Sequence, residues 1–397
     1  MLMRQVHDEG IRQAAKFASR PAVDRAYCER ALQFVLAKID QNIAAFTDGF
    51  PAPASKDHIY PVIPNDKWTS SFWTGMLWLA YEWTGDEKYR RAAEAQLPSF
   101  RQRIRERTHT HTHDLGFLYS LSAVADYKIT ADPAARELAL EAADLLSARY
   151  LKQAGIIQAW GDLNDPEQRG RMIIDCCMNL PLLYWAAAES GRREFYEMAL
   201  SHARQAARYL VREDASTYHT FYMDAISGEP RFGKTHQGYS DNSCWARGQA
   251  WAIYGFALSY RYSGDSEFPA LIQKVANYFL NRLPEDNVCY WDLIFTAGNE
   301  ERDSSAAAIA ACGLLEFAKT LPLTHEYRTV YENAALAMVQ SLTESYTTAE
   351  LKHSNGILRH AVYNKPAGEG VDECNIWGDY YYFEALVRLL KDWRLYW

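Results

Sequence analysis

The sequence lacks the cysteine patterns of a disulfide-bonded or zinc-binding protein. Its seven cysteines are odd in number, lie mostly in apolar runs and show no Cys-x-x-Cys spacing. We therefore expect reduced thiols in the core. The chain also lacks a glycine-rich phosphate loop, a Gly-x-Ser-x-Gly elbow and a His-Glu-x-x-His motif. These absences exclude the most recognisable nucleotide-binding, serine-hydrolase and zinc-protease sites.

Long apolar runs and a basic stripe are absent as well. No stretch approaches the ~20 apolar residues that cross a bilayer, and the N-terminal sequence MLMRQVHDEGIRQAAKF contains no apolar core of a signal peptide. The net charge of −8 argues against a nucleic acid as the partner. We therefore predict a cytoplasmic protein that binds neither a membrane nor a nucleic acid.

Aromatic side chains, in contrast, are abundant. Phe, Trp and Tyr make up 14% of the 397 residues, with 26 Tyr, 16 Phe and 12 Trp. Such residues fill large cores, and their flat apolar faces also stack on sugar rings. The composition is therefore compatible with a carbohydrate site, although core filling is the simpler explanation for any single aromatic residue.

An internal repeat organises the chain. Six segments are apolar nearly all round, as helices buried on every side must be, at residues 68–83, 115–128, 179–190, 246–263, 305–320 and 379–390. Each is paired with a segment whose apolar residues recur on one helical face, at residues 27–46, 88–104, 134–150, 194–212, 270–282 and 326–343. Six buried helices alternating with six half-exposed helices predict an inner ring wrapped by an outer ring.

The fold that this repeat predicts is an all-α (α/α)6 barrel. We expect residues 1–397 to form a single catalytic domain, with residues 1–25 as an N-terminal extension that packs on the barrel. An open helical solenoid is the alternative, because a hairpin repeat alone does not require the ring to close. Strand signals are few and short, which disfavours an α/β fold.

Acids, amides and indoles gather in the segments that enter the predicted inner helices. In such a barrel these N-terminal ends share one rim, while the opposite turns carry plain Gly-Asp or Ala-Asp pairs. The asymmetry predicts a functional site at that rim. The acids and indoles concerned are Asp114, Asp175, Asp303, Asp379, Trp68, Trp160 and Trp377.

Several polar residues of the rim also have ordinary structural roles. Asp is a favoured helix N-cap, which is the simpler interpretation for Asp303 and Asp379 and remains open for Asp114. The run HTHTH at residues 109–113 has neither an acid-rich surrounding nor a Cys pair, so a polar loop is favoured over a metal site. His219, isolated in STYHTFY, is by default a core or turn histidine.

Asp175 fits the cap interpretation poorly. It lies in the apolar run MIIDCCM, and Pro181 marks the first turn of the next helix, which places the cap at Asn179 or Leu180. A carboxyl group buried without a capping role has a raised pKa, and a general acid near neutral pH requires this property.

The segments around these residues carry a resemblance to a known family. HDLGFLYSLSA, AGIIQAWGD, IIDCCMNLPLLYWA, STYHTFY, THQGYSDNSCWARGQAWAIYGFAL, VCYWD, RDSSAAAIAACGLLE and NIWGDYYYFEAL together resemble the unsaturated glucuronyl hydrolases, glycoside hydrolase family 88. The resemblance runs in order from about Trp68 to the C-terminus. It implies an (α/α)6 barrel that needs no metal or cofactor.

The resemblance also implies a substrate and a reaction. Family members act on oligosaccharides left by polysaccharide lyases, and release a Δ4,5-unsaturated uronic acid from the non-reducing end by hydrating its C4=C5 bond. For this chain it implies glycosaminoglycan disaccharides or oligosaccharides as substrates. We expect a monomer or a weak dimer.

The family's site residues match positions of this sequence one by one. The resemblance makes Asp175 the general acid and base, with Asp114 as its carboxylate partner. Arg247 is implied as the bidentate partner of the uronate carboxylate. The remaining binding residues that it implies are Trp68, Trp160 and Trp251 as stacking groups, and His113, His219 and Gln237 as polar contacts.

One loop departs from the family pattern. Members that favour 6-sulfated units carry Ser-x-x-Ser-x-Lys, whereas the corresponding stretch YNKPAGEG supplies Asn364, Ala367 and Glu369. Glu369 in place of a cation is expected to repel sulfate, although Lys365 nearby could compensate. The sequence therefore predicts a weak preference for the 6-sulfated unit.

Three other functions remain as alternatives. An unsaturated rhamnogalacturonyl hydrolase would share the fold and chemistry but act on a pectin-derived disaccharide. A sugar epimerase on a similar barrel would be expected to use histidine bases. A non-catalytic carbohydrate-binding barrel would need the tryptophans but not the two acids, so replacement of Asp175 by Asn separates it from the hydrolase.

Overall fold

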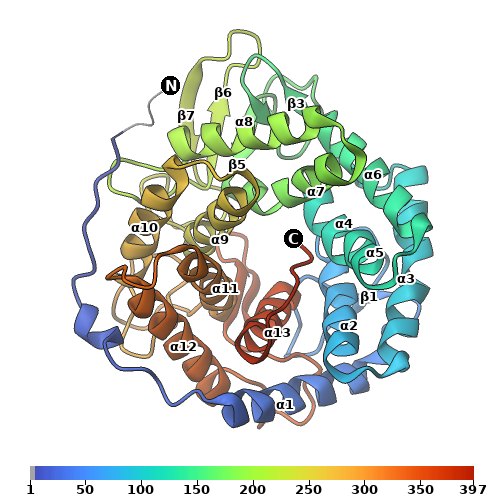
Figure 1. The fold of residues 1–397 in the computed structure, drawn as a ribbon, viewed down its shortest axis with the longest axis vertical. Helices are drawn as coiled ribbons and strands as arrows, with labels where there is room; N and C mark the ends of the chain where they lie inside the picture. Colours follow the sequence, from blue (N-terminus) through green and yellow to red (C-terminus); the bar gives the residue numbers. More distant parts are fainter. Residues whose placement is uncertain (1–4) are drawn as a thin grey trace.

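The protein is described by a computed structural model that covers residues 5–397 (Figure 1). Its inner ring consists of α2 (Ser70–Thr84), the continuous run α4–η2–α5 (Leu115–Tyr119, Ser120–Val124 and Ala125–Thr130), α7 (Leu180–Ser190), α9 (Ala246–Ser263), α11 (Ser304–Thr320) and α13 (Ile376–Leu390). The outer ring consists of α1 (Arg25–Ile43), α3 (Glu87–Arg105), α6 (Pro133–Ser147), α8 (Arg193–Tyr209), α10 (Glu267–Leu280) and α12 (Arg328–Ser345).

The inner ring is closed. Each inner helix contacts the next, and the last one, α13, contacts the first, α2. Figure 1 shows the outer helices wrapped around this ring. The predicted (α/α)6 barrel is confirmed, and closure rules out the open solenoid.

The hairpin turns at the rim opposite the site follow from local sequence. Gly85 ends α2 and Gly191 ends α7 with φ values of 71° and 75°, a left-handed conformation that glycine adopts without strain. Asp86 and Asp132 then cap the outer helices that follow, each accepting a backbone N–H two residues later. The Asp side chains of these turns are occupied as helix caps, so we expect no catalytic role for them.

Short antiparallel strands occupy the loops between helices. They form the pairs β1 (Phe50–Pro51) with β2 (Val62–Ile63), β3 (Tyr150–Leu151) with β4 (Ile156–Ile157), and β8 (Ala361–Asn364) with β9 (Glu369–Glu373). A three-stranded sheet joins β5 (Arg171–Ile173), β6 (Thr220–Met223) and β7 (Pro230–Lys234) in that order. Two 3-10 segments, η1 (Ala14–Phe17) and η3 (Ile174–Met178), complete the elements. The sheet and the β8–β9 hairpin lead into α9 and α13 and shape the site.

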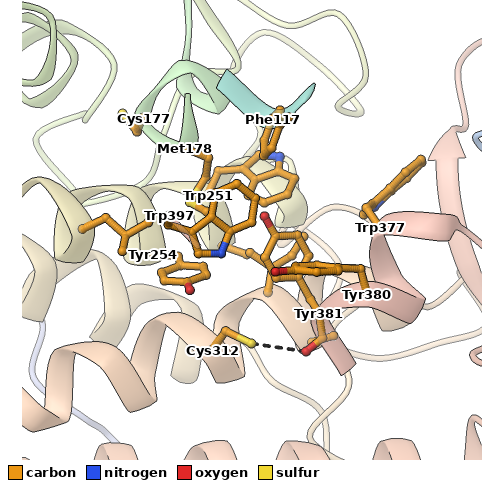
Figure 2. Packing of buried hydrophobic residues seen from close by; sticks show 14 of the residues in the cluster. Phe117, Cys177, Met178, Trp251, Tyr254, Cys312, Trp377, Tyr380, Tyr381 and Trp397 are labelled. Atoms are coloured by element: carbon orange, nitrogen blue, oxygen red, sulfur yellow. Dashed lines mark hydrogen bonds between the residues drawn. The ribbon is translucent and has the colours of Figure 1, made fainter. Parts of the chain in front are cut away.

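The two ends of the described chain pack on the barrel in different ways. Residues 5–24 lie against outer helices, where Asn333 donates to the Phe17 carbonyl and Arg282 pairs with Glu9 at 2.6 Å. The C-terminal segment lies near the centre of the ring (Figure 1). There the Trp397 indole, 1% exposed, donates to Glu384 and stacks on Tyr381 with ring centroids 5.9 Å apart (Figure 2). This packing fills the barrel axis with aromatic side chains.

No helix in residues 5–397 combines the length and hydropathy that a membrane span requires. Within the same residues no group of three or more His, Cys, Asp or Glu side chains is placed to hold a metal ion. All seven cysteines are buried and unpaired.

Candidate active site

A cavity of about 200 Å³ opens at the rim where the inner helices begin. Two larger hollows, of about 650 and 720 Å³, flank α3 and contain none of the predicted site residues, whereas a neighbouring hollow of about 390 Å³ shares Trp68, Asp114 and Trp160 with the cavity. The small cavity brings eight of the nine predicted residues together and adds two others. Its lining consists of Trp68, His113, Asp114, Trp160, Asp175, His219, His236, Gln237, Arg247 and Tyr363.

Asp175 faces this cavity from η3, ahead of α7. It does not cap α7, because Asn179 occupies the N-cap position. The Oδ2 atom of Asp175 is buried and has no hydrogen-bond partner within residues 5–397. Burial raises the pKa of Asp175 to about 7, helped by the negative charge of Asp114 and opposed by Arg247. Near neutral pH this carboxyl can therefore both hold and release a proton.

Asp114 lies beside it and is held by its own loop. Its side chain does not cap α4; instead it accepts a 2.6 Å hydrogen bond from the Thr112 hydroxyl and lies 3.4 Å from His113 Nε2. Burial raises the pKa of Asp114 to about 6, while the Thr112 hydrogen bond and nearby arginines act in the opposite direction. Burial thus raises the pKa values of both carboxyl groups, and the negative charge of Asp114 adds to the increase at Asp175.

Asn179 joins the two acids. It is buried, its Oδ1 accepts from Phe117 N at 2.7 Å, and its Nδ2 donates to the Asp175 carbonyl at 3.2 Å. Its amide also lowers the pKa of Asp114. The contact depends on Gly116, because a Cβ there would lie 2.3 Å from Asn179 Cα. Asn179 therefore fixes the segment that carries Asp175 against the helix that follows Asp114.

The other two rim acids have structural roles. Asp303 caps α11 by accepting from Ser305 N and Ala306 N, as expected. Asp379 is not a cap: it lies inside the first turn of α13 and accepts from the Tyr60 hydroxyl and from two backbone N–H groups of the 357–358 segment.

Arg247 is 1% exposed and largely occupied by the protein. Its Nη1 donates to Asp303 at 3.0 Å and to the Val362 carbonyl, and its Nη2 donates to the Tyr363 carbonyl at 2.7 Å and to Gln237 Oε1 at 3.5 Å. A uronate carboxylate can gain Nη2 only by replacing Gln237, the longest of these contacts. The two terminal amino groups of Arg247 are therefore largely occupied, which disfavours a bidentate grip that uses both of them.

The cavity histidines are neutral. His219 Nδ1 accepts the backbone N–H groups of His236 and Gln237, each at 3.0 Å, which assigns the ring proton to Nε2. Burial holds the pKa of His219 well below its usual range and lowers the pKa of His113 to about 3. Neutral imidazoles can hydrogen-bond a sugar, but they carry no proton that they could donate as an acid at neutral pH.

The three predicted tryptophans do not share one environment. Trp68 and Trp160 line the cavity, and Trp68 Nε1 donates to the Tyr363 hydroxyl. Trp251 lies outside the lining: it is fully buried against Phe117 and Tyr381, with centroids 5.3 and 5.5 Å away (Figure 2). The structure thus places Trp251 in the core behind the site.

Two lining residues were not predicted. His236 immediately precedes Gln237 in a quoted motif, so its neighbour was the available signal. Tyr363 is the first residue of the YNKPAGEG stretch, so its position beside Asn364 was the available signal.

The chain is similar to several known proteins over most or all of its length. The chain is 46% identical to the unsaturated chondroitin disaccharide hydrolase of Streptococcus pneumoniae over the full length of both proteins. It is 45% identical to the unsaturated glucuronyl hydrolase of Bacillus sp. strain GL1, over 93% of this chain and 98% of that protein. The crystal structure of the unsaturated glucuronyl hydrolase of Streptococcus agalactiae matches at a TM-score of 0.97 and 45% identity, covering all of both chains. The family described as Glycosyl Hydrolase Family 88 matches residues 42–388, and the chain belongs to this family.

Proposed function

We propose that this protein is a glycoside hydrolase that releases Δ4,5-unsaturated glucuronic acid from the non-reducing end of glycosaminoglycan oligosaccharides produced by lyases. The observation that carries the proposal is the Asp114–Asp175 pair, with pKa values of about 6 and 7, in a cavity of about 200 Å³. A cavity of this size suits one sugar ring. A Streptococcus agalactiae relative has been solved in complex with dGlcA-GalNAc6S, which favours a chondroitin-type disaccharide over a pectin-derived one.

The reaction we propose begins with protonated Asp175. It donates its proton to C4 of the double bond, and the cation at C5 is stabilised by the ring oxygen. A water molecule then adds at C5 and returns a proton to the Asp175 carboxylate, which restores the acid. The resulting hemiketal opens and releases the remaining saccharide. Ionised Asp114 holds the pair in its singly protonated form, and neutral His113 and His219 serve as hydrogen-bonding groups for the sugar.

The remaining residues of the proposed site bind and orient the substrate. Trp68 and Trp160 provide flat walls, Gln237 and Arg247 take the uronate carboxylate, and His236 and Tyr363 are added from the cavity lining. Lys365 is unsuited to bind a sulfate, because it pairs with Glu300 at 3.6 Å and more closely with Glu301. The proposed weak preference for 6-sulfated units therefore persists.

We further propose that the chain acts as one catalytic domain, in the cytoplasm, as a monomer or weak dimer. A single cluster of buried hydrophobic residues supports one domain, and the seven unpaired cysteines support a reducing compartment. A single cooperative unfolding transition and light scattering at micromolar concentrations test the domain and oligomer predictions.

The test of the function is loss of the ultraviolet absorbance of the C4=C5 bond across a panel of lyase-derived disaccharides. We expect wild-type turnover of chondroitin or hyaluronan products, and losses of at least ~10³-fold in Asp175→Asn and large losses in Asp114→Asn, with the fold retained. Activity confined to a pectin product would identify a rhamnogalacturonyl hydrolase. Undiminished sugar binding without any turnover would identify a carbohydrate-binding protein.

A further inference from the structure

Arg171, the first residue of β5, lies beside the mouth of the cavity. Its guanidinium lies over the Trp160 ring at 5.0 Å and over the Tyr222 ring at 5.3 Å. Its Nε donates to the Tyr222 hydroxyl at 2.8 Å. Burial lowers the pKa values of His219 and His236, which line the cavity, and the charge of Arg171 acts in the same direction. A positive charge is therefore held against Trp160, one of the residues that line the cavity.

The terminal amino groups of Arg171 are unengaged. The Nε atom makes its one hydrogen bond, and neither Nη1 nor Nη2 has a hydrogen bond or ion pair with any residue between 5 and 397. The two aromatic rings and the Tyr222 hydroxyl hold the planar group in place, so little side-chain freedom remains to be lost on binding. This arrangement presents a pre-positioned pair of donors to an anionic group.

Three other cations near the cavity are less suited to this role. Arg247 donates to four protein acceptors, and Lys365 is neutralised by Glu300 and Glu301. Lys234 also acts on His236, but its side chain is exposed on the outer strand β7. Glu369 of the hairpin acts on His236 with the opposite sign. Around His236, the β8–β9 hairpin therefore contributes a negative charge at Glu369, and the sheet contributes a positive charge at Arg171.

We propose that Arg171 and the Trp160 ring beneath it form an anion-binding subsite for a sulfate ester on the reducing-side sugar. The inference rests on the proposed function, since it concerns the sugar that follows the unsaturated uronate. Two oxygens of a sulfate match the fork of Nη1 and Nη2, and such charge-assisted pairs are the strong ones among hydrogen bonds. The sulfate group thus binds on the β5–β6 side of the cavity, away from the hairpin that carries Glu369.

The experiment compares kcat/KM for unsulfated, 4-sulfated and 6-sulfated unsaturated chondroitin disaccharides. In wild-type protein and in Arg171→Gln, the ratio of each sulfated substrate to the unsulfated one is measured. We expect the ratio for at least one sulfated isomer to fall about fivefold in Arg171→Gln, as for a half-exposed charge pair. Arg171→Lys keeps the charge but not the fork and should lie in between. High salt should reduce the wild-type ratio because it screens an exposed pair.

Arg231→Gln is the matched control. Arg231 lies on β7 of the same sheet, with its guanidinium 5.4 Å from the Phe232 ring, and it does not line the cavity. Its substitution should leave the ratios unchanged. Ratios unchanged in Arg171→Gln, or an equal loss on all three substrates, would overturn the subsite. Absence of wild-type turnover on every disaccharide would instead overturn the proposed function.

Discussion

Replacing Asp175 by Asn should remove a pH-dependent loss of stability. The pKa of this carboxyl is about 7 in the folded protein against an ordinary value of 3.8. Because folding raises the pKa of an acid here, the folded state favours the protonated form. The contribution of Asp175 to the free energy of unfolding is fully present below the pKa of the unfolded state. It is lost as the pH rises through the pKa of the folded state, between about pH 4 and pH 7.

The magnitude follows from the two pKa values. Each pKa unit corresponds to about 1.4 kcal/mol, so the complete loss is at most about 4 kcal/mol. Integration between pH 5 and pH 8 gives roughly 2.5 kcal/mol of that loss. An Asn side chain has nearly the same shape and does not ionise. The variant should therefore become more stable than the wild type as the pH rises, while losing its activity.

Urea unfolding at pH 5 and pH 8, followed by circular dichroism, measures this difference. The quantity of interest is the change in the unfolding free energy of the wild type between the two pH values, minus the same change in Asp175→Asn. Asp392→Asn, whose side chain is fully exposed, is the control and should follow the wild type. If wild type and Asp175→Asn lost stability equally, the carboxyl would have no raised pKa and the proposed acid would be wrong.

Three further predictions concern the same site. The kcat/KM should fall about tenfold per pH unit above about pH 7, because Asp175 ionises there. It should also fall below about pH 6, because Asp114 becomes protonated. A kcat/KM that stays constant up to pH 9 would contradict this prediction. Asn179→Ala should lower kcat and move the acid limb to higher pH, because Asp114 loses a neighbouring donor; an unshifted pH profile would mean a purely structural role. Trp251→Phe should leave KM within about twofold in steady-state kinetics but lower the free energy of unfolding by about 1–3 kcal/mol in urea. A large increase in KM would instead show that Trp251 contacts the substrate.

The helices were predictable because their signals are local. The run LPLLYWAAAES is apolar all round and ends at Gly191, and it forms α7 at Leu180–Ser190. The π-helical turn Ser120–Val124 inside an inner helix has no comparable signal. Its sequence, SLSAV, fits an ordinary helix, and only tertiary packing decides the difference.

The site was predictable where a loop carries its own motif, and less so along a buried helix. Arg247 and Trp251 are one turn apart on the same face of α9, so periodicity treats them alike. Their depths differ: Arg247 reaches the cavity, and Trp251 lies one turn further along α9, behind Phe117. His236 and Tyr363 come from loops whose placement depends on the β5–β7 sheet and the β8–β9 hairpin, contacts that a linear sequence does not reveal.

The filled barrel axis has a consequence for how a polymer can be degraded. Behind the cavity, Phe117 packs against Trp251 and Trp397, and these buried rings occupy the centre of the ring in residues 5–397 (Figure 2). A saccharide chain cannot thread past the acids, and its end alone can reach them. The free sugar and the shortened chain must both leave through the entrance, so each binding event releases one sugar. The next unsaturated end must then be created by a separate cleavage elsewhere, which couples the rate of this enzyme to the supply of newly cut ends.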